Sequence, residues 1–410
     1  MTKLVTEIKT GLDFGSGIKP VGRLGMREGI IYFQYHDDFL QQGIEISPFR
    51  LPLQKGVIEL PKRPFEGLAG VFSDSLPDGW GRLLFDRMVR AKGINPSDLS
   101  SLDRLAHVGL HGMGALVYEP DYSPTESHKL IDLDHLSTQA YEVLKGGPEI
   151  VIDELLALNG SSAGARPKAL IGVHEDRNQI VFGAKQLEGE FEPWLVKFPN
   201  SQDGRDAGAI EYVYAQMAKV AGVSMPEVHL FPSQKGDGYF AVKRFDRTKG
   251  KKLHMHSVSG LLNSDFRTPS LDYEDLINLT GILTKDIREV EKMYRLAVFN
   301  VLAHNRDDHS KNFSFLMDES GDWKLAPAYD LTFSSGPAGE QSTMVMGEGK
   351  NPTLIHLVKL GSESKLPKKL IEGIIEETRT ALNQWEPLAK NHGVSQENIL
   401  LVSRLINGNP

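Results

Sequence analysis

The side chains best suited to chemistry lie in a polar run, His304 to Asn312, and in a shorter run that ends at Asp330. The first run contains Asp307, and Asn312 follows it after five residues. Phosphoryl transfer requires such a set, because one carboxylate orients the attacking hydroxyl while an asparagine and a second aspartate hold magnesium on the nucleotide phosphates. The spacing therefore predicts Asp307 as the catalytic base and Asn312 and Asp330 as Mg²⁺ ligands.

The polar run is framed by two apolar segments, a predicted helix at Tyr294–Ala303 and a predicted strand at Phe313–Met317. A polar connecting turn would also be rich in Asp, Asn, His and Ser. A loop held between core elements is nevertheless a frequent site of function, which favours the catalytic interpretation. Lys311 is then predicted to contact the transferring phosphate, and His309 to contact phosphate or to fix the loop.

A metal-hydrolase site is the alternative interpretation of His304 and His309. Their spacing of five differs from the i, i+4 pair of a helical zinc motif, and no zinc signature is present in the sequence. The pair therefore gives little support to zinc chemistry.

Lys197 lies inside the apolar segment Trp194–Phe198, where a lysine is poorly placed unless it has a partner or a ligand. Kinases direct such a strand lysine at the nucleotide phosphates and pair it with a helix glutamate. Glu211, early in the next predicted helix, is the natural partner. An edge strand with the lysine pointing outward is the alternative.

A loop of small residues, Gly160 to Lys168, precedes a predicted strand. Backbone N–H groups of such loops can cradle phosphates, with Lys or Arg adding charge. The loop lacks the Gly-Lys-Ser/Thr ending of a Walker motif. Taken alone, the loop is better explained as a flexible connector.

Hydrophobic periodicity predicts the elements that must position these residues. The first sixty residues are strand-rich, and a helical pattern follows the Pro77-Asp78-Gly79 turn. Beyond residue 270 the pattern is mostly helical outside 304–335. The prediction is an α+β, two-lobed protein-kinase-like fold with a β-rich N-terminal half and a mainly α-helical C-terminal lobe. The family resemblance carried by the four motif segments below implies an extra N-terminal subdomain in addition. The predicted segments are 1–148, 149–245 and 246–410. Within them we expect strands near 29–35, 168–173, 179–184, 193–198 and 240–245, and helices near 149–158, 207–221, 366–391 and 395–406.

Composition is that of a soluble globular protein: 410 residues, 40% hydrophobic, 24% charged and a net charge of −8. The chain has no cysteine, which excludes disulfides, thiolate zinc sites and cysteine nucleophiles. The acidic balance disfavours binding of nucleic acid across the whole chain. We find no apolar membrane segment and no signal sequence, so a cytoplasmic location is expected.

Four segments together resemble the HipA family of bacterial serine/threonine kinases, the toxin half of a toxin–antitoxin pair. They match the family in order from about residue 20 to residue 350. The segments are Ser75–Arg82, Ser161–Lys168, Phe240–Arg247, and Asn305–Asn312 together with Ala326–Asp330.

The resemblance implies an ATP site. Lys197 would contact the ATP phosphates, and Lys168 with the preceding Ala163 and Gly164 would cover them. Lys243 and Phe245 would supply hinge backbone contacts to adenine. Lys243 replaces the acidic residue usual in this family segment, so a contact through the backbone would survive and one through the side chain would not.

The resemblance also implies regulation and partners. Ser161 aligns with the serine that family members autophosphorylate, and the adjacent Ser162 leaves the modified residue open. The implied partners are a small helix-turn-helix antitoxin of HipB type, which would make most of the DNA contacts, and a protein substrate such as an aminoacyl-tRNA synthetase. A small-molecule kinase and a catalytically silent partner-binding protein remain alternatives. A catalytically silent protein is disfavoured because the set is intact: Asp307, Asn312, Asp330 and Lys197.

Overall fold

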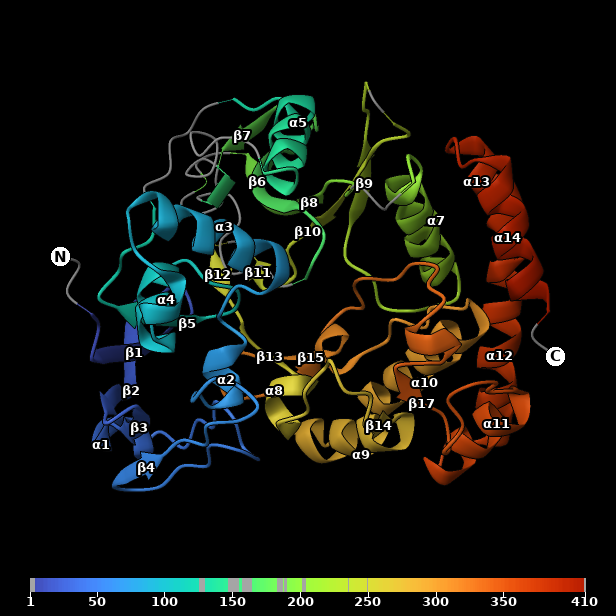
Figure 1. Cartoon of the computed structure of the whole chain (residues 1–410). Coiled ribbons are helices and arrows are strands. Elements are labelled where there is room, and N and C mark those ends of the chain that lie inside the picture. Colours follow the sequence, from blue (N-terminus) through green and yellow to red (C-terminus); the bar gives the residue numbers. More distant parts are fainter. Residues whose placement is uncertain are drawn as a thin grey trace.

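The computed structural model describes most of the chain (Figure 1). The predicted helix near 149–158, apart from Leu155 and Leu156, and the loop residues 159–163 lie outside the described residues. The described residues are 4–124, 130–146, 155–156, 164–182, 187, 190–200, 204–234, 236–248 and 250–408. No helix in these ranges is both long enough and apolar enough to span a bilayer.

The N-terminal domain is built on an antiparallel sheet in the order β4-β3-β2-β1-β5. Glu28 and Gly29 both have left-handed φ values, 54° and 74°, as the tight turn between β2 and β3 requires. In β3 buried residues alternate with half-buried ones, so one face of the strand meets the core. The elements are β1 Glu7–Asp13, β2 Ile18–Arg27, β3 Ile30–Tyr35, β4 Val57–Glu59, β5 Leu116–Glu119, α1 Asp37–Leu40, α2 Gly70–Ser73, α3 Gly79–Ala91 and α4 Ser101–Val108.

A second antiparallel sheet, in the order β7-β6-β8-β10-β9, forms the β-rich lobe of the kinase-like half. Its core includes Trp80 of α3 and Leu136 of α5 together with Trp194 of the sheet. The N-terminal part of the chain thus packs into this lobe, and the predicted division at residue 148 stays a proposal. The elements are α5 Leu133–Leu144, β6 Lys168–His174, β7 Ile180–Phe182, β8 Phe191–Lys197, α7 Ala207–Val220, β9 Val228–Phe231 and β10 Tyr239–Lys243.

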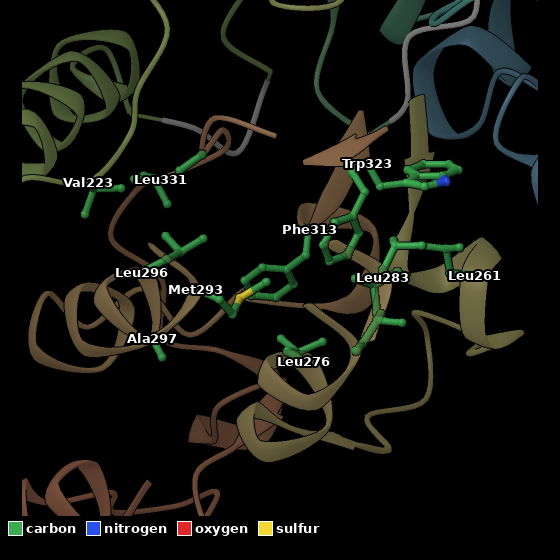
Figure 2. Packing of buried hydrophobic residues seen from close by; sticks show 14 of the residues in the cluster. Val223, Leu261, Leu276, Leu283, Met293, Leu296, Ala297, Phe313, Trp323 and Leu331 are labelled. Atoms are coloured by element: carbon green, nitrogen blue, oxygen red, sulfur yellow. The ribbon is translucent and has the colours of Figure 1, made fainter. Parts of the chain in front are cut away.

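The C-terminal lobe is mainly helical, with α9 and α10 at its centre. Met293 of α10, Leu276 of α9 and Phe313 pack together there (Figure 2). The helices are α8 Val258–Leu262, α9 Tyr273–Thr284, α10 Ile287–Leu302, α11 Leu354–Glu363, α12 Lys368–Leu382, α13 Trp385–Asn391 and α14 Gln396–Asn407. The short strands are β11 Arg247–Thr248, β12 Lys251–Lys252, β13 His254–Ser257, β14 Leu271–Asp272, β15 Ser314–Met317, β16 Trp323–Leu325 and β17 Thr343–Met344.

The prediction of one helix near 366–391 is wrong, because the structure has two, α12 and α13. Pro387 gives the physical reason: it lacks an N–H and would break the interior of a continuous helix, but it is tolerated in the first turn of a new one. The break also places Trp385 in the core, where its ring lies 5.7 Å from that of Tyr214 in α7.

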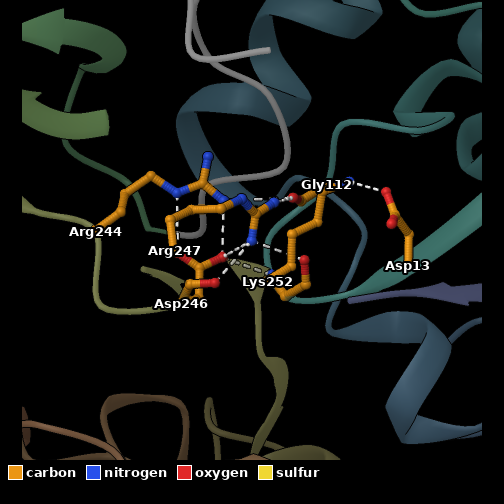
Figure 3. Close-up of polar contacts among 7 residues, drawn as sticks. Asp13, Gly112, Arg244, Asp246, Arg247 and Lys252 are labelled. Carbon is orange, nitrogen blue, oxygen red and sulfur yellow. Dashed lines mark hydrogen bonds and ion pairs between the residues drawn. The ribbon is translucent and has the colours of Figure 1, made fainter. Parts of the chain in front are cut away.

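A buried ionic network joins the N-terminal domain to the kinase-like half (Figure 3). Asp246 is fully buried and accepts hydrogen bonds from Arg244 at 2.7 Å and 2.9 Å, and from Arg247 at 2.6 Å. It also accepts from the Gly114 N–H at 2.7 Å, and Arg247 donates to the Gly112 carbonyl at 2.9 Å. The loop before β5 is therefore fixed to the segment that follows β10.

Candidate active site

The predicted catalytic loop, between α10 and β15, is anchored to α10 and α9 by a chain of hydrogen bonds. Asn305 donates to Asn300 at 2.9 Å, Asn300 donates to the Tyr273 hydroxyl at 2.9 Å, and Tyr273 donates to Asp308 at 2.6 Å. Asp308 also accepts from the N–H groups of Ser342 and Thr343. Burial outweighs these donors and raises the pKa of Asp308 to about 7.

Asp307 projects from this anchored loop with 59% of its side chain exposed, so an acceptor hydroxyl can reach it. The surrounding protein restricts hydration and raises its pKa; the Asp330 charge adds to the rise, and His309 opposes it. His309 Nε2 lies 3.9 Å from the Asp307 carboxylate, and the Asn312 side-chain amide donates to the Asp307 carbonyl at 2.7 Å. The predicted base, His309 and Asn312 therefore form one compact loop.

Lys197 connects the two lobes at this point. Its ammonium group donates to Glu211 at 2.5 Å and also donates to Asp330. Burial alone would lower the pKa of Lys197, but the Asp330 and Glu211 carboxylates raise it. Burial alone would likewise raise the pKa of Asp330, yet Lys197 and Lys168 hold it well below its usual range. The Lys197 ammonium group thus lies between the carboxylates of Glu211 and Asp330.

Two further basic residues, Lys168 and Arg166, lie beside Lys197 and Glu211. Lys168 is directly opposite Lys197 in the β6–β8 ladder, and burial lowers its pKa to about 8. Arg166 donates to Glu211 at 3.1 Å, on the carboxylate oxygen that Lys197 does not use. Sequence reasoning did not predict the pairing of Arg166 with Glu211, although the position of Arg166 within the small-residue loop was a usable signal.

Lys311 contacts a residue of the N-terminal domain. Its ammonium group donates to Asp78 at 2.5 Å and lies 4.8 Å from the centre of the Phe266 ring. Asp78 also accepts a hydrogen bond from the Gly164 N–H. Sequence reasoning missed Asp78, because a Pro-Asp-Gly sequence is already explained by a turn.

The predicted hinge residues lie at the end of β10. The Lys243 ammonium group pairs with Glu192 at 2.5 Å, and its backbone N–H donates to the Glu227 carbonyl, so an adenine contact by Lys243 would use its carbonyl. Phe245 stacks on Tyr329, the neighbour of Asp330, with ring centres 5.6 Å apart. The predicted hinge and the segment that carries the predicted metal ligand Asp330 are thus in contact. Ser161, Ser162 and Ala163 lie outside the described residues, whereas Gly164 is described.

The donor set suits magnesium on phosphates better than a metal held by protein alone. In the described ranges of the chain, no three His, Cys, Asp or Glu side chains cluster as a metal site. Mg²⁺ in nucleotide sites typically takes one or two protein ligands and completes its shell with phosphate oxygens and water. Asp330 is held ionised, and Asn312 uses its amide nitrogen on Asp307, which leaves the amide oxygen as its possible ligand atom.

In the β-rich lobe a strand lysine is paired with a helix glutamate. The helical lobe carries an Asp and an Asn on one loop and a second Asp after the following hairpin. This combination defines a two-lobed kinase-like protein. Known structures agree. A chain of the solved complex of the Shewanella oneidensis MR-1 toxin–antitoxin system HipA, HipB and its operator DNA superposes with a TM-score of 0.68. The match covers 98% of this chain and 95% of that chain at 16% identity, and it confirms the predicted fold class.

Family models and curated relatives give the family. The HipA-like C-terminal domain matches residues 160–385, and the HipA N-terminal domain matches residues 16–119. The chain therefore belongs to the HipA family, which confirms the resemblance seen in its motifs. "Putative kinase Y4mE" of Sinorhizobium fredii is 27% identical over 81% of this chain and 79% of its own length. "Serine/threonine-protein kinase toxin HipA" of Shewanella oneidensis is 25% identical over 72% of this chain and 68% of its own length.

Proposed function

We propose that this protein is an ATP- and Mg²⁺-dependent protein serine/threonine kinase. The observation that supports it most strongly is the convergence of Lys197, Glu211 and Asp330 from three separate elements beside the Asp307 loop. These residues lie on a strand, a helix and the segment after a hairpin, which is how kinases divide the same roles. A merely structural ion pair would not need the neighbouring Asp307 and Asn312.

Each side chain has a distinct role in the proposal. Lys197 and Lys168 bind the nucleotide phosphates, and Glu211 keeps Lys197 oriented. Asn312 and Asp330 hold Mg²⁺, which when bound neutralises charge on the phosphate oxygens. Asp307 orients the acceptor hydroxyl and accepts its proton, a task that depends on reach more than on an unusual pKa.

The division of the chain is part of the same proposal. Residues 1–148 are the HipA-type N-terminal subdomain, 149–245 the β-rich lobe with the phosphate loop, and 246–410 the helical lobe with the catalytic and metal motifs. Lys243 and Phe245 form the hinge that binds adenine.

We also propose a setting for the activity. The protein acts in the cytoplasm as a toxin, and a HipB-type helix-turn-helix antitoxin binds it and carries most of the contacts to DNA. The relative in the Shewanella complex, with HipB and operator DNA, supports this pairing. The substrate would be a protein of translation, such as an aminoacyl-tRNA synthetase, an inference that rests on the family resemblance alone.

The test compares the wild-type protein with Asp307→Asn, which keeps the shape and removes the carboxylate. We expect phosphoryl transfer to fall by a factor on the order of a hundred or more with little change in folding. Asp322→Asn is the matched control, because Asp322 is exposed on the β15–β16 turn. Phosphoproteomics after induced expression of each variant would identify the substrate. Full transfer by Asp307→Asn, or transfer only to a small molecule, would contradict the proposal.

Autophosphorylation is the second part of the proposal. A phosphate on Ser161 or Ser162 would add about two negative charges to a loop that binds nucleotide phosphates, and repulsion would weaken ATP binding. Incubation with ATP and mass spectrometry, with Ser161→Ala and Ser162→Ala as separate variants, would locate the site. Phosphate found only outside 159–168, or undiminished ATP affinity in the phosphorylated form, would refute the mechanism.

A further inference from the structure

The backbone of Gly164, in the middle of the predicted phosphate loop, is hydrogen-bonded through both its N–H and its carbonyl to the turn at residues 78–80. Its N–H donates to the Asp78 carboxylate, and its carbonyl accepts from the Trp80 N–H at 3.0 Å. Gly79, between these two residues, has a φ of 44°. A Cβ there would lie 2.5 Å from the Gly164 oxygen and 2.7 Å from Ala165 Cα, so a side chain would prevent the approach.

The second oxygen of the same carboxylate binds the catalytic loop. Lys311 donates to Asp78 Oδ2 at 2.5 Å, and both side chains are largely buried, with exposed fractions of 14% and 19%. Burial alone would raise the pKa of Asp78, but Lys311 and the Gly164 amide outweigh it and lower the pKa. The carboxylate is therefore ionised at neutral pH, and its two oxygens face two different segments.

Asp78 does not do what its position in the helix predicts. It is the N-cap residue of α3, where an aspartate ordinarily accepts a hydrogen bond from the first turn of its own helix. Here the side chain makes no cap hydrogen bond. Its carboxylate instead joins segments that lie 86 and 233 residues away in the sequence. A residue that served only to start α3 would not show this pattern.

We infer that Asp78 is a positioning residue contributed by the N-terminal domain, which couples the position of the Gly164 backbone to the orientation of Lys311. The inference rests on the proposed kinase function and on the prediction from the sequence that Lys311 contacts the transferring phosphate. A displacement of Gly164 removes one of the two restraints on Asp78 and so loosens Lys311. Asp78 itself touches no reacting atom.

Three variants separate these contacts in the full-length protein. Asp78→Asn keeps an oxygen for the Gly164 N–H and removes the charge that holds Lys311, so kcat should fall roughly ten- to a hundredfold while KM for ATP stays within about threefold. Asp78→Ala loses both contacts, so kcat should fall and KM for ATP should rise. Asp86→Asn is the control, because Asp86 lies on the same helix and pairs with Arg82 at 3.1 Å. It should behave as wild type.

A double-mutant cycle distinguishes positioning from general destabilisation. If Asp78 acts through Lys311, adding Asp78→Asn to Lys311→Gln should lower kcat by less than about twofold. A purely structural role would give the same fractional loss in both backgrounds. That result, or a wild-type kcat in Asp78→Asn, would overturn the inference.

Amide hydrogen exchange provides a readout that needs no activity. In Asp78→Ala, peptides covering 164–168 should exchange faster than in wild type, whereas Asp78→Asn and Asp86→Asn should leave them protected. Unchanged exchange in Asp78→Ala would overturn the coupling. Failure of wild-type protein to transfer phosphate would instead overturn the proposed function, so the two failures are distinguishable.

Discussion

Asp330 is the residue on which most of the charge in the candidate site converges. It faces Lys197 and Lys168, which are directly opposite one another on adjacent strands. Two buried ammonium groups so placed repel each other unless a carboxylate lies between them. Asp330 therefore has two roles in the proposal: it offsets the lysines before the nucleotide binds, and it offers an oxygen to magnesium.

Replacement of Asp330 by alanine should abolish the Mg²⁺-dependent part of the stabilisation by ATP. A ligand that binds only the folded state stabilises it by about 2.7 kcal/mol at a hundredfold excess over Kd. Thermal unfolding with ATP, with and without Mg²⁺, measures this shift. Asp322→Asn, one hairpin strand away, should retain it. An unaltered ATP–Mg²⁺ shift in Asp330→Ala would count against its role as a ligand.

For single residues, sequence reasoning could identify candidates that lie near one another along the chain in a recognisable motif. Asp307 and Asn312 were visible from their spacing, and Lys197 from its apolar surroundings. The structure also places Lys197 beside its predicted partner Glu211. Asp78 and Asp308 could not be found this way, because their partners are distant in sequence and a turn or loop already accounts for an aspartate.

Among the elements, helix α7 determines where Glu211 lies. Tyr214 donates to the carbonyl of Ala303, at the end of α10, at 2.7 Å. At the start of the helix, Asp206 accepts from the Ser395 N–H at 2.8 Å and from the Asn398 amide at 3.0 Å and 3.1 Å. Figure 1 shows α7 beside the C-terminal helices. The helix that carries Glu211 is thus tied to the helical lobe at two places, the end of α10 and the start of α14.

Periodicity predicted α7 nearly to the residue, from 207 to 221 against Ala207–Val220. It could not predict that the C-terminal helices hold it, because hydrophobic spacing records which face is buried but not against which element. The break between α12 and α13 was missed for a related reason. Both helices are apolar on one side, and only Pro387 marks the new start.

Asp206→Ala should therefore loosen α7 and weaken ATP binding without touching the site. The loss of hydrogen bonds to a nearly buried carboxylate should lower the free energy of unfolding by about 1–3 kcal/mol, and KM for ATP should rise because Glu211 no longer orients Lys197. Urea unfolding and kinase kinetics measure the two effects. Glu397→Gln, exposed in the first turn of α14, is the control. A destabilised variant with an unchanged KM would show that α7 is held by other contacts.

The whole molecule is organised by contacts that cross its predicted segments. Helix α3 contributes Trp80 to the core of the β-rich lobe, and the turn before it reaches the catalytic loop through Asp78. The Arg244–Asp246–Arg247 network fixes the loop at 112–114 to the segment that follows β10 (Figure 3). Element order was enough to predict two lobes, and the family resemblance added the N-terminal subdomain. Neither could reveal that a residue of the N-terminal domain contacts the loop that carries the predicted base.

Asp246→Asn tests how much this joint contributes to the stability of the whole chain. Both arginines would keep their charge in a buried environment without a carboxylate, so the free energy of unfolding should fall by about 3–5 kcal/mol. Asp13→Asn is the matched control from the same joint. Its pair with Lys252 is partly exposed, and its loss should cost below about 1 kcal/mol. Denaturant unfolding at pH 7 measures both values.

The stabilisation contributed by Asp246 should also depend on pH. Burial alone would raise the pKa of Asp246, but Arg244 and Arg247 hold it well below the value of about 3.9 expected in the unfolded chain. The unfolded state therefore binds the proton first, and the stabilisation is fully present above about pH 4 and declines as the pH falls below it. The difference in unfolding free energy between wild type and Asp246→Asn should accordingly narrow from pH 5 to pH 3. A difference that stayed constant over this interval, or one below about 1 kcal/mol at pH 7, would mean that packing of α3 rather than the ionic network holds the N-terminal domain in place.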